Sequence, residues 1–198
     1  MANTNPTFSI SGFKTAIGKP VRPNLFKAVL RGWDKASTDE NDLLGVYLTR
    51  NDVTDIDEFS FRCEKAEFPG RTIATSEDTG GGGPTLKLPY DVTYNDIQLS
   101  IICASDMAER KFFEKWMDFI VKPGDSSLGG GTVAFYSQYA LGNTLEVSQL
   151  TDAGVPAIKY TCHHVYPIAI TPMNATWEEI NTYQRFGVTL AYRYHTYA

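Results

Sequence analysis

The strongest constraint on the fold of this chain is a period of two in its apolar residues. In residues 186–194, large apolar side chains stand at every second position and alternate with small or polar ones. The segments 59–64 and 97–103 repeat this pattern. Successive side chains of a β-strand point to opposite faces, so the alternation is typical of a strand with one buried face. The sequence therefore predicts a mainly β fold.

About eight strands are expected, and most of them are joined by short turns. Clusters of glycine, proline, asparagine and aspartate mark those turns. Residues 71–75 are expected to continue the sheet. The predicted strands cover residues 24–32, 59–68, 86–90, 97–103, 132–141, 145–150, 157–166 and 186–194.

One segment follows a helical period instead. Ser105 or Asp106 is a suitable N-terminal cap, and Lys122-Pro123-Gly124 ends the segment. The sequence predicts a helix over about 106–121 whose wide apolar stripe packs against the core. The stripe consists of Phe112, Phe113, Trp116, Met117 and Ile120.

The strand and helix content places the chain in the mainly β (α+β) class. Short connections favour an antiparallel two-sheet β-sandwich or β-barrel, with the single helix covering one open side. A chain of 198 residues is long enough for one domain with a real core. We expect an N-terminal arm over 1–22, where Pro23 disfavours a helix, and a single domain over 23–198.

No catalytic, metal or cofactor site is expected, and the chain is not expected to be an enzyme. His163 and His164 are neighbours on a predicted strand and point to opposite faces, so they cannot easily share a metal ion. The glycines 80–83 lack the following Gly-Lys-Ser or Gly-Lys-Thr of a phosphate loop. Three cysteines without metal-type spacing fall on apolar strand faces and are expected to be buried free thiols: Cys63, Cys103 and Cys162.

The net charge is −5 and the isoelectric point is about 5.2. Such a balance argues against a protein that grips nucleic acid, because neutralising phosphates needs clustered lysine and arginine. The charge does not argue against a protein along which nucleic acid moves without being bound. No stretch approaches the roughly 20 apolar residues of a membrane helix. The first twenty residues hold no apolar block of signal-peptide length, so we expect the product to stay in the cytoplasm in which it is made.

Two internal segments break the strand pattern. Residues 34–57 form an acidic insertion that is expected to be largely solvated. Apolar residues within it, such as Leu44 and Tyr47, could form a short strand or a contact for a neighbour, and a partner contact and a merely solvated loop are equally compatible with the sequence. Residues 76–84 contain four consecutive glycines, which maximise backbone freedom, and are expected to form a flexible projecting loop.

The order and spacing of several motifs resemble the tail tube proteins of bacteriophages with contractile, T4-like tails, and more distantly secretion-needle tube proteins. The resemblance spans about residues 22–194, and the acidic insertion departs from it, since a short hairpin would be expected there. The matching motifs are Arg22-Pro23-Asn24-Leu25-Phe26, Phe61-Arg62-Cys63-Glu64-Lys65-Ala66 running into Phe68-Pro69-Gly70, the helix with Phe112, Phe113 and Trp116, and the run from Phe186 to Tyr192.

The resemblance implies a two-sheet β-barrel with a flanking helix. Six subunits would form a ring, and stacked rings would form a hollow conduit for genome delivery. It also implies tail sheath, baseplate, tape-measure and tail-terminator proteins as partners, with double-stranded DNA passing through the lumen without specific binding. The protein would then be part of the virion and would be assembled in the host cytoplasm.

Ring and stack contacts need exposed elements, and the N-terminal arm, the acidic insertion and the glycine loop supply the candidates. These inter-subunit contact residues are Phe8, Ile10, Phe13, Leu44, Tyr47, Ser76, Glu77, Asp78, Gly80, Gly81, Gly82 and Gly83. Two alternatives remain. The first is the tube of a bacterial contractile injection or secretion system, or a tube initiator or terminator protein. The second is a monomeric β-barrel that binds a small apolar ligand.

Overall fold

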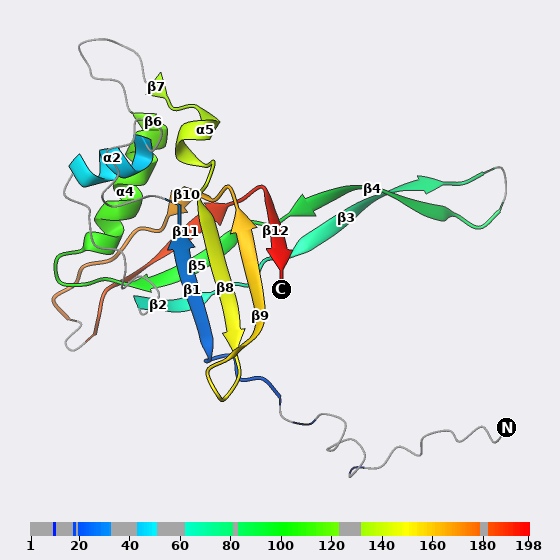
Figure 1. Ribbon diagram of the computed structural model, residues 1–198, viewed down its shortest axis with the longest axis horizontal. Coiled ribbons are helices and arrows are strands. Elements are labelled where there is room, and N and C mark those ends of the chain that lie inside the picture. Colours follow the sequence, from blue (N-terminus) through cyan, green and yellow to red (C-terminus); the bar gives the residue numbers. More distant parts are fainter. Residues whose placement is uncertain are drawn as a thin grey trace.

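The structure is a computed structural model. It describes residues 10, 18, 20–32, 43–50, 62–80, 83–122, 132–178 and 182–198. Two four-stranded antiparallel sheets pack face to face, and a long two-stranded hairpin extends far from this body (Figure 1). The described strands form an open sandwich rather than a closed barrel, so of the two predicted forms the sandwich is confirmed.

The first sheet has the strand order β1-β8-β9-β12, and the second has the order β10-β11-β5-β2. Both sheets are antiparallel throughout. The first sheet consists of β1 (Phe26–Arg31), β8 (Thr144–Leu150), β9 (Pro156–His163) and β12 (Tyr194–Tyr197). The second consists of β10 (Tyr166–Ile170), β11 (Arg185–Ala191), β5 (Ile97–Ile102) and β2 (Cys63–Ala66).

Two predicted strands, 157–166 and 186–194, each turn out to be two strands that pass from one sheet to the other. The turns lie side by side, since the backbone N–H of Arg193 donates to the carbonyl of His163 at 3.0 Å. His164 has φ of 60°, a left-handed conformation that breaks the strand. The apolar alternation does not reveal these two turns, because the strands before and after each turn bury side chains in the same core.

The predicted helix is confirmed as α4 (Ala108–Ile120). Its aromatic stripe is fully buried on the sandwich: Phe112, Phe113 and Trp116 are 0% exposed. Phe113 packs edge-on against Phe186 of β11 at a centroid distance of 6.2 Å. Asp106 supports the start of the helix by accepting the backbone N–H of Ala108 at 3.3 Å.

Residues within the acidic insertion form a second helix, α2 (Leu43–Arg50), where we expected a strand or a loop. Its apolar residues recur at helical spacing, so that Leu44 and Leu48 are both buried in the core. Tyr47 of α2 lies against Phe119 of α4 at 5.3 Å. The other residues of the insertion, 34–42 and 51–57, lie outside the described part of the chain.

The predicted strand 132–141 is wrong. Only β7 (Thr132–Val133) is a strand there, and it pairs with β6 (Val121–Lys122). The short helix α5 (Tyr136–Tyr139) follows. The carbonyl of Tyr139 accepts hydrogen bonds from the indole of Trp116 at 3.3 Å and from the amide of Asn143 at 2.6 Å. The bond from Trp116 fixes the helical turn against α4, an effect that the local sequence pattern does not contain.

The hairpin consists of β3 (Arg71–Asp78) and β4 (Leu86–Tyr94), and among the described strands these two pair with each other alone. Residues 71–75 therefore do not continue the sheet of β2. The expected loop over 76–84 is also shorter than predicted, because Ser76, Glu77 and Asp78 belong to β3. Gly80, with φ of 26°, lies in the turn that follows.

Two of the three cysteines behave as expected. Cys63 and Cys162 are buried free thiols, and burial raises the pKa of each to about 12. Cys103 is only half-buried, and its sulfur lies 3.8 Å from that of Met173. Across the described ranges, no helix combines the length and apolar character needed to cross a membrane.

One buried ion pair fastens the chain beside β2 to α4. The Glu109 side chain, only 5% exposed, pairs with Arg62 and accepts the backbone N–H of Ala104 at 3.0 Å. We expect Glu109→Gln to lower the free energy of unfolding by about 2–3 kcal/mol, because it removes one partner of a pair that is mostly withdrawn from water. Urea unfolding of the unassembled subunit measures this change.

The matched control is Glu114→Gln on the same helix. Glu114 is half-exposed and pairs with Arg110 one turn away at 2.7 Å. Pairs of this kind contribute about 0.5 kcal/mol or less. Equal losses in the two variants would contradict the structural role given to Glu109.

Candidate assembly surfaces

The β3–β4 hairpin exposes an unusual amount of apolar surface. Leu86 is 59% exposed and Tyr90 is 72% exposed, and the same holds to a lesser degree for Leu88 and Val92. An isolated two-stranded hairpin is marginally stable in water, and it normally requires a further surface to pack against. This element therefore has the composition of a contact surface rather than of a solvated loop.

The strand register divides these apolar residues between the two faces of the hairpin. Ile73 pairs with Val92 near the body. A bulge between Ala74 and Thr75 shifts the register, so that toward the tip Ser76 pairs with Leu88 and Asp78 with Leu86. Counting along β3, Ile73 lies on one face and the partners of the two tip leucines on the other. The hairpin thus presents apolar side chains on opposite faces at two distances from the body.

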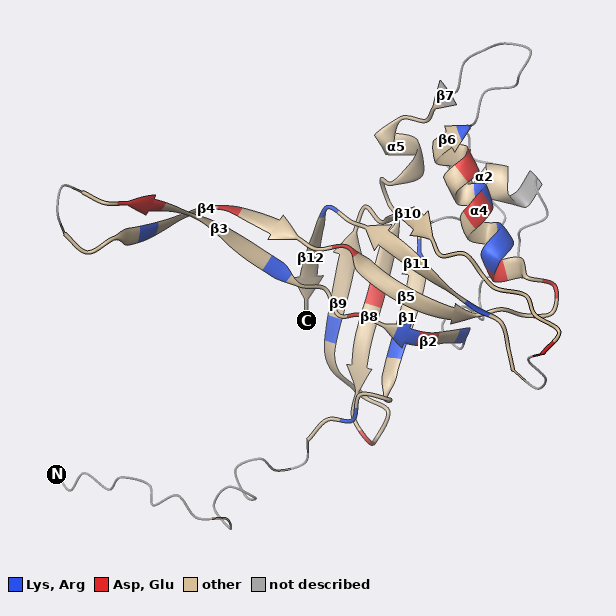
Figure 2. Ribbon diagram, turned by 180° about the vertical axis from the view of Figure 1, so that it is seen from behind, with Lys and Arg blue, Asp and Glu red and all other residues tan. Residues whose placement is uncertain are grey.

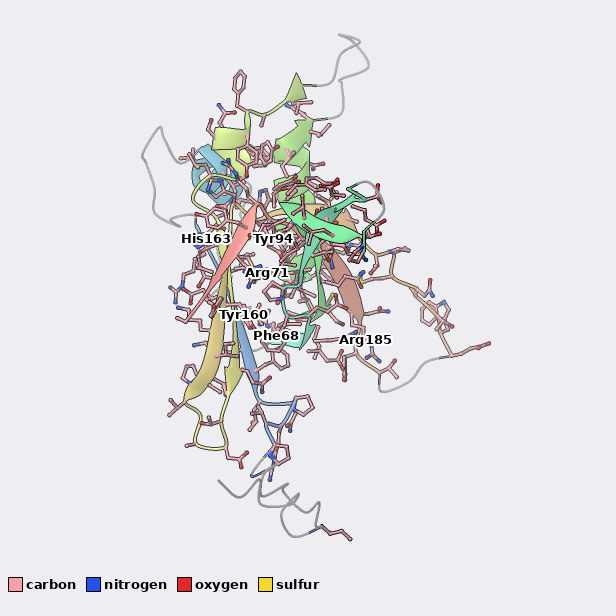
Figure 3. The ribbon with its side chains drawn as sticks, turned by 90° about the vertical axis from the view of Figure 1, so that its right-hand side faces the viewer. Phe68, Arg71, Tyr94, Tyr160, His163 and Arg185 are labelled. Carbon is pink, nitrogen blue, oxygen red and sulfur yellow. The ribbon has the colours of Figure 1, made fainter. Side chains whose placement is uncertain are left out.

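An aromatic cluster holds the root of the hairpin to the sandwich. Tyr94 at the end of β4 lies 5.8 Å from Tyr192 and 5.2 Å from His195. Phe68 packs edge-on against Tyr160 of β9 at 5.8 Å. The Tyr192 hydroxyl donates to a backbone carbonyl just before β3, that of Gly70, at 3.2 Å. Figure 3 shows Phe68, Arg71, Tyr94 and Tyr160 gathered at this root.

The electrostatics of the root are set by partial burial. Burial, and to a lesser extent the Arg71 guanidinium, lower the pKa of His195 below its ordinary value. Nδ1 of His195 is enclosed without a hydrogen-bond partner. Burial also raises the pKa of Tyr192 far above the ordinary range of a tyrosine. Both groups are therefore uncharged at neutral pH, and the root is held by packing.

The outer face of the second sheet carries small and polar side chains. Gln98, Ser100 and Thr189 line a shallow depression of about 160 Å³ there, together with Gly187 and Lys65. A Cβ atom at Gly187 would lie 3.1 Å from the Thr171 side chain, so this position suits only glycine without a local shift. Figure 2 shows basic and acidic residues interspersed along the hairpin and sheets. Among the residues that the structure describes, none group into a metal-binding cluster.

The residues predicted to contact neighbouring subunits differ in their exposure. Leu44 is 2% exposed and belongs to the subunit's own core, and Tyr47 is half-buried against Phe119. Ile10 is exposed, whereas Phe8, Phe13, Gly81 and Gly82 lie outside the described residues. The remaining predicted residues are exposed in or beside the hairpin: Ser76, Glu77, Asp78, Gly80 and Gly83.

Sequence reasoning missed the exposed apolar residues of the hairpin and one exposed aromatic, Trp177. Leu86, Leu88 and Tyr90 alternate as in a half-buried strand, and nothing local separates a strand buried in its own subunit from one that is not. Trp177, in the segment between β10 and β11, is fully exposed, with a relative accessibility of 102% for the whole residue. A tryptophan in a polar, irregular stretch was the available signal.

This architecture defines a class of protein. The chain belongs to the phage tail tube protein family, whose model matches residues 22–198. The resemblance inferred from the motifs is thereby confirmed. It is a family of structural tube proteins. No curated protein sequence matches the chain significantly.

Solved structures share the fold at low sequence identity. A chain of the anti-feeding prophage baseplate is 12% identical, with a TM-score of 0.60 over 91% of this chain and 97% of that one. A chain of the anti-feeding prophage tube-terminating cap is 14% identical, with a TM-score of 0.58 over 100% and 99%. A chain of the sheath–tube complex of the PVC extracellular contractile injection system is 13% identical, with a TM-score of 0.56 over 97% and 99%.

Mild acid is expected to destabilise the root of the hairpin. Since the pKa of His195 is lower in the folded chain than its ordinary 6.5, the unfolded chain binds a proton first as the pH falls. The contribution of neutral His195 to the free energy of unfolding is therefore fully present above about pH 6.5, and it is lost as the pH falls from there to the folded-state pKa. His164 acts in the same direction, because burial, Arg193 and His163 lower its pKa.

The variant His195→Gln removes one of these two titrating groups. Thermal unfolding of the unassembled subunit should show a smaller loss of stability between about pH 7.5 and about pH 5.5 in this variant than in the unmodified chain. An unchanged pH dependence in His195→Gln would contradict the role assigned to the root histidine.

Proposed function

We propose that copies of this chain assemble into rings, six to a ring, which stack into a hollow tail tube. The observation that supports this most is the β3–β4 hairpin, which leaves Ile73, Leu86 and Tyr90 exposed. Soluble monomers rarely leave such a surface uncovered unless another molecule covers it. A nine-residue strand such as β4 spans about 30 Å, so the hairpin reaches beyond its own subunit.

The hairpin supplies a repeating contact along the tube axis. Its tip, with Leu86 and Leu88, docks on a subunit of the adjacent ring, while the sandwich bodies contact one another around the ring. Contacts of this kind are heterologous, because the donor surface and the acceptor surface differ and repeat from copy to copy. The N-terminal arm, with Phe8, Ile10 and Phe13, and the glycines 80–83 add further contacts between subunits.

The tube is a conduit rather than a catalyst. Double-stranded DNA passes through the bore without specific binding, since the chain carries a net charge of −5 and a basic wall would hold the phosphates. The outer face with Gln98, Ser100 and Thr189 is the best candidate for the bore wall, because most of the side chains that line its depression are uncharged, with Lys65 as the exception. The subunit needs no cofactor, and the assembled tube is part of the virion, formed in the host cytoplasm.

The expected partners follow from the same role. The structural relatives come from a sheath–tube complex, a tube-terminating cap and a baseplate. By analogy, this tube contacts a tail sheath, a baseplate and a tail terminator, and it encloses a tape-measure protein. Since one of these relatives belongs to an extracellular contractile injection system, the second candidate function is the tube of such a system. Capsid and terminase genes beside this gene would indicate the phage role.

Replacing the tip leucines tests the assembly role. The double variant Leu86→Ser with Leu88→Ser should remain folded but raise the critical concentration for tube formation at least roughly tenfold, because each leucine buried on assembly contributes about 1.5–3 kcal/mol. Sedimentation and negative-stain microscopy measure this change.

The control variant changes the opposite face of the same segment. Glu77 and Lys87 are cross-strand partners, both largely exposed, and form a 3.7 Å ion pair. Serine at both positions should leave tube formation nearly unchanged, because exposed pairs contribute little. If unmodified chains stay monomeric at every concentration, the assembly proposal is wrong.

A further inference from the structure

Trp177 stands out among the exposed side chains. It is 102% exposed, so it contacts almost nothing in its own subunit. Burying a tryptophan removes roughly 150–250 Å² from water, and tryptophan is enriched among the residues that dominate interface energies. Glu178 follows it directly and is also exposed. The pair therefore presents a large apolar ring beside a negative charge.

A groove of matching character lies elsewhere on the same chain. The α4–β10 groove, formed between the end of α4 with β6 and the start of β10, has a volume of about 390 Å³. A cavity of about 150 Å³ is enough to bind benzene, so this groove has room for an indole ring. Its lining is mainly apolar and consists of Met117, Asp118, Ile120, Val121, Tyr166, Pro167 and Ile168.

Two polar features of the groove complement the segment around Trp177. The Asp118 carboxylate is a hydrogen-bond acceptor, and a buried indole N–H requires one. Lys122, which follows Val121 in the chain, is exposed. Across the described residues, neither Lys122 nor Glu178 forms a salt bridge within the subunit.

The two surfaces cannot meet within one subunit. In Figure 1 the segment between β10 and β11 lies at the lower left of the body, whereas the end of α4 and β6, which contribute Met117, Ile120 and Val121 to the groove, lie near the top. A donor on one part of the surface and an acceptor on another is the arrangement that joins identical copies head to tail.

We propose that Trp177 of one subunit inserts into the α4–β10 groove of a neighbouring copy. Its indole N–H donates to the Asp118 carboxylate, and Glu178 pairs with Lys122. This inference rests on the proposed self-assembly, and it names a contact that the β3–β4 hairpin does not provide. The apolar tip of that hairpin and the N-terminal arm are the competing occupants of the groove.

A charge exchange tests the contact directly. Glu178→Lys and Lys122→Glu should each raise the critical concentration for assembly several-fold, because each places like charges opposite one another. The combination of both should restore assembly toward that of the unmodified chain, whereas unrelated surface positions would only add their separate effects. Additive losses in the combined variant would overturn the proposal.

Cysteine cross-linking identifies the occupant of the groove. Trp177→Cys combined with Ile168→Cys should give a ladder of covalent oligomers on oxidation of assembled tubes. Trp177→Cys alone, or combined with Val155→Cys in the turn between β8 and β9, should not. A ladder from Leu88→Cys with Ile168→Cys, and none from the Trp177 pair, would show that the hairpin tip occupies the groove and would overturn the proposal.

These outcomes separate the two levels of inference. Trp177→Ala should raise the critical concentration at least tenfold while the circular dichroism spectrum of the subunit is unchanged, since the side chain contacts almost nothing in its own subunit. If the unmodified chain forms tubes and Trp177→Ala forms them equally well, this contact is wrong and the tube function stands. If the unmodified chain forms no tubes, the proposed function itself fails.

Discussion

The burial of one helix face on the sandwich is the interaction on which the rest of the structure depends. Phe112, Phe113 and Trp116 of α4 are completely enclosed, and each touches another aromatic ring. The same helix then fixes its surroundings by directed bonds. The indole N–H of Trp116 donates to the carbonyl of Tyr139. The Glu109 carboxylate forms an ion pair with Arg62 and accepts the backbone N–H of Ala104. These bonds thereby attach the irregular segments around Tyr139 and Ala104 to the same body.

Such a body can carry elements that do not support themselves. The β3–β4 hairpin buries little of its own surface, and the aromatic root with Tyr94, Tyr192 and His195 ties it to the sandwich. The groove beside α4 is likewise open because the helix is already secured by its other face. The interior stabilises the subunit, and the exposed apolar elements remain available for other copies, as the proposed tube requires.

The parts of the fold that the sequence predicts depend on neighbouring residues, whereas the parts that it does not predict depend on contacts between residues far apart in the chain. The strands β1, β5 and β8 and the helix α4 were predicted because their apolar periods are local and long. The strand predicted over 132–141 failed because a long-range hydrogen bond, from the Trp116 indole of α4 to the carbonyl of Tyr139, favours a helical turn there. Among the described contact candidates, Ser76, Glu77 and Asp78 lie on the hairpin, whereas Leu44 is buried because α2 turns it into the core.

By itself, the sequence determined the β-rich class, the amphipathic helix and the absence of a transmembrane-length apolar run, since each is a property of neighbouring residues. Only the tertiary structure decided where the chain changes sheets at His164 and Arg193, because one alternating pattern serves strands of either sheet facing a common core. It also decided that Leu86 and Trp177 face outward, since the exposure of a side chain depends on distant segments that no local period records.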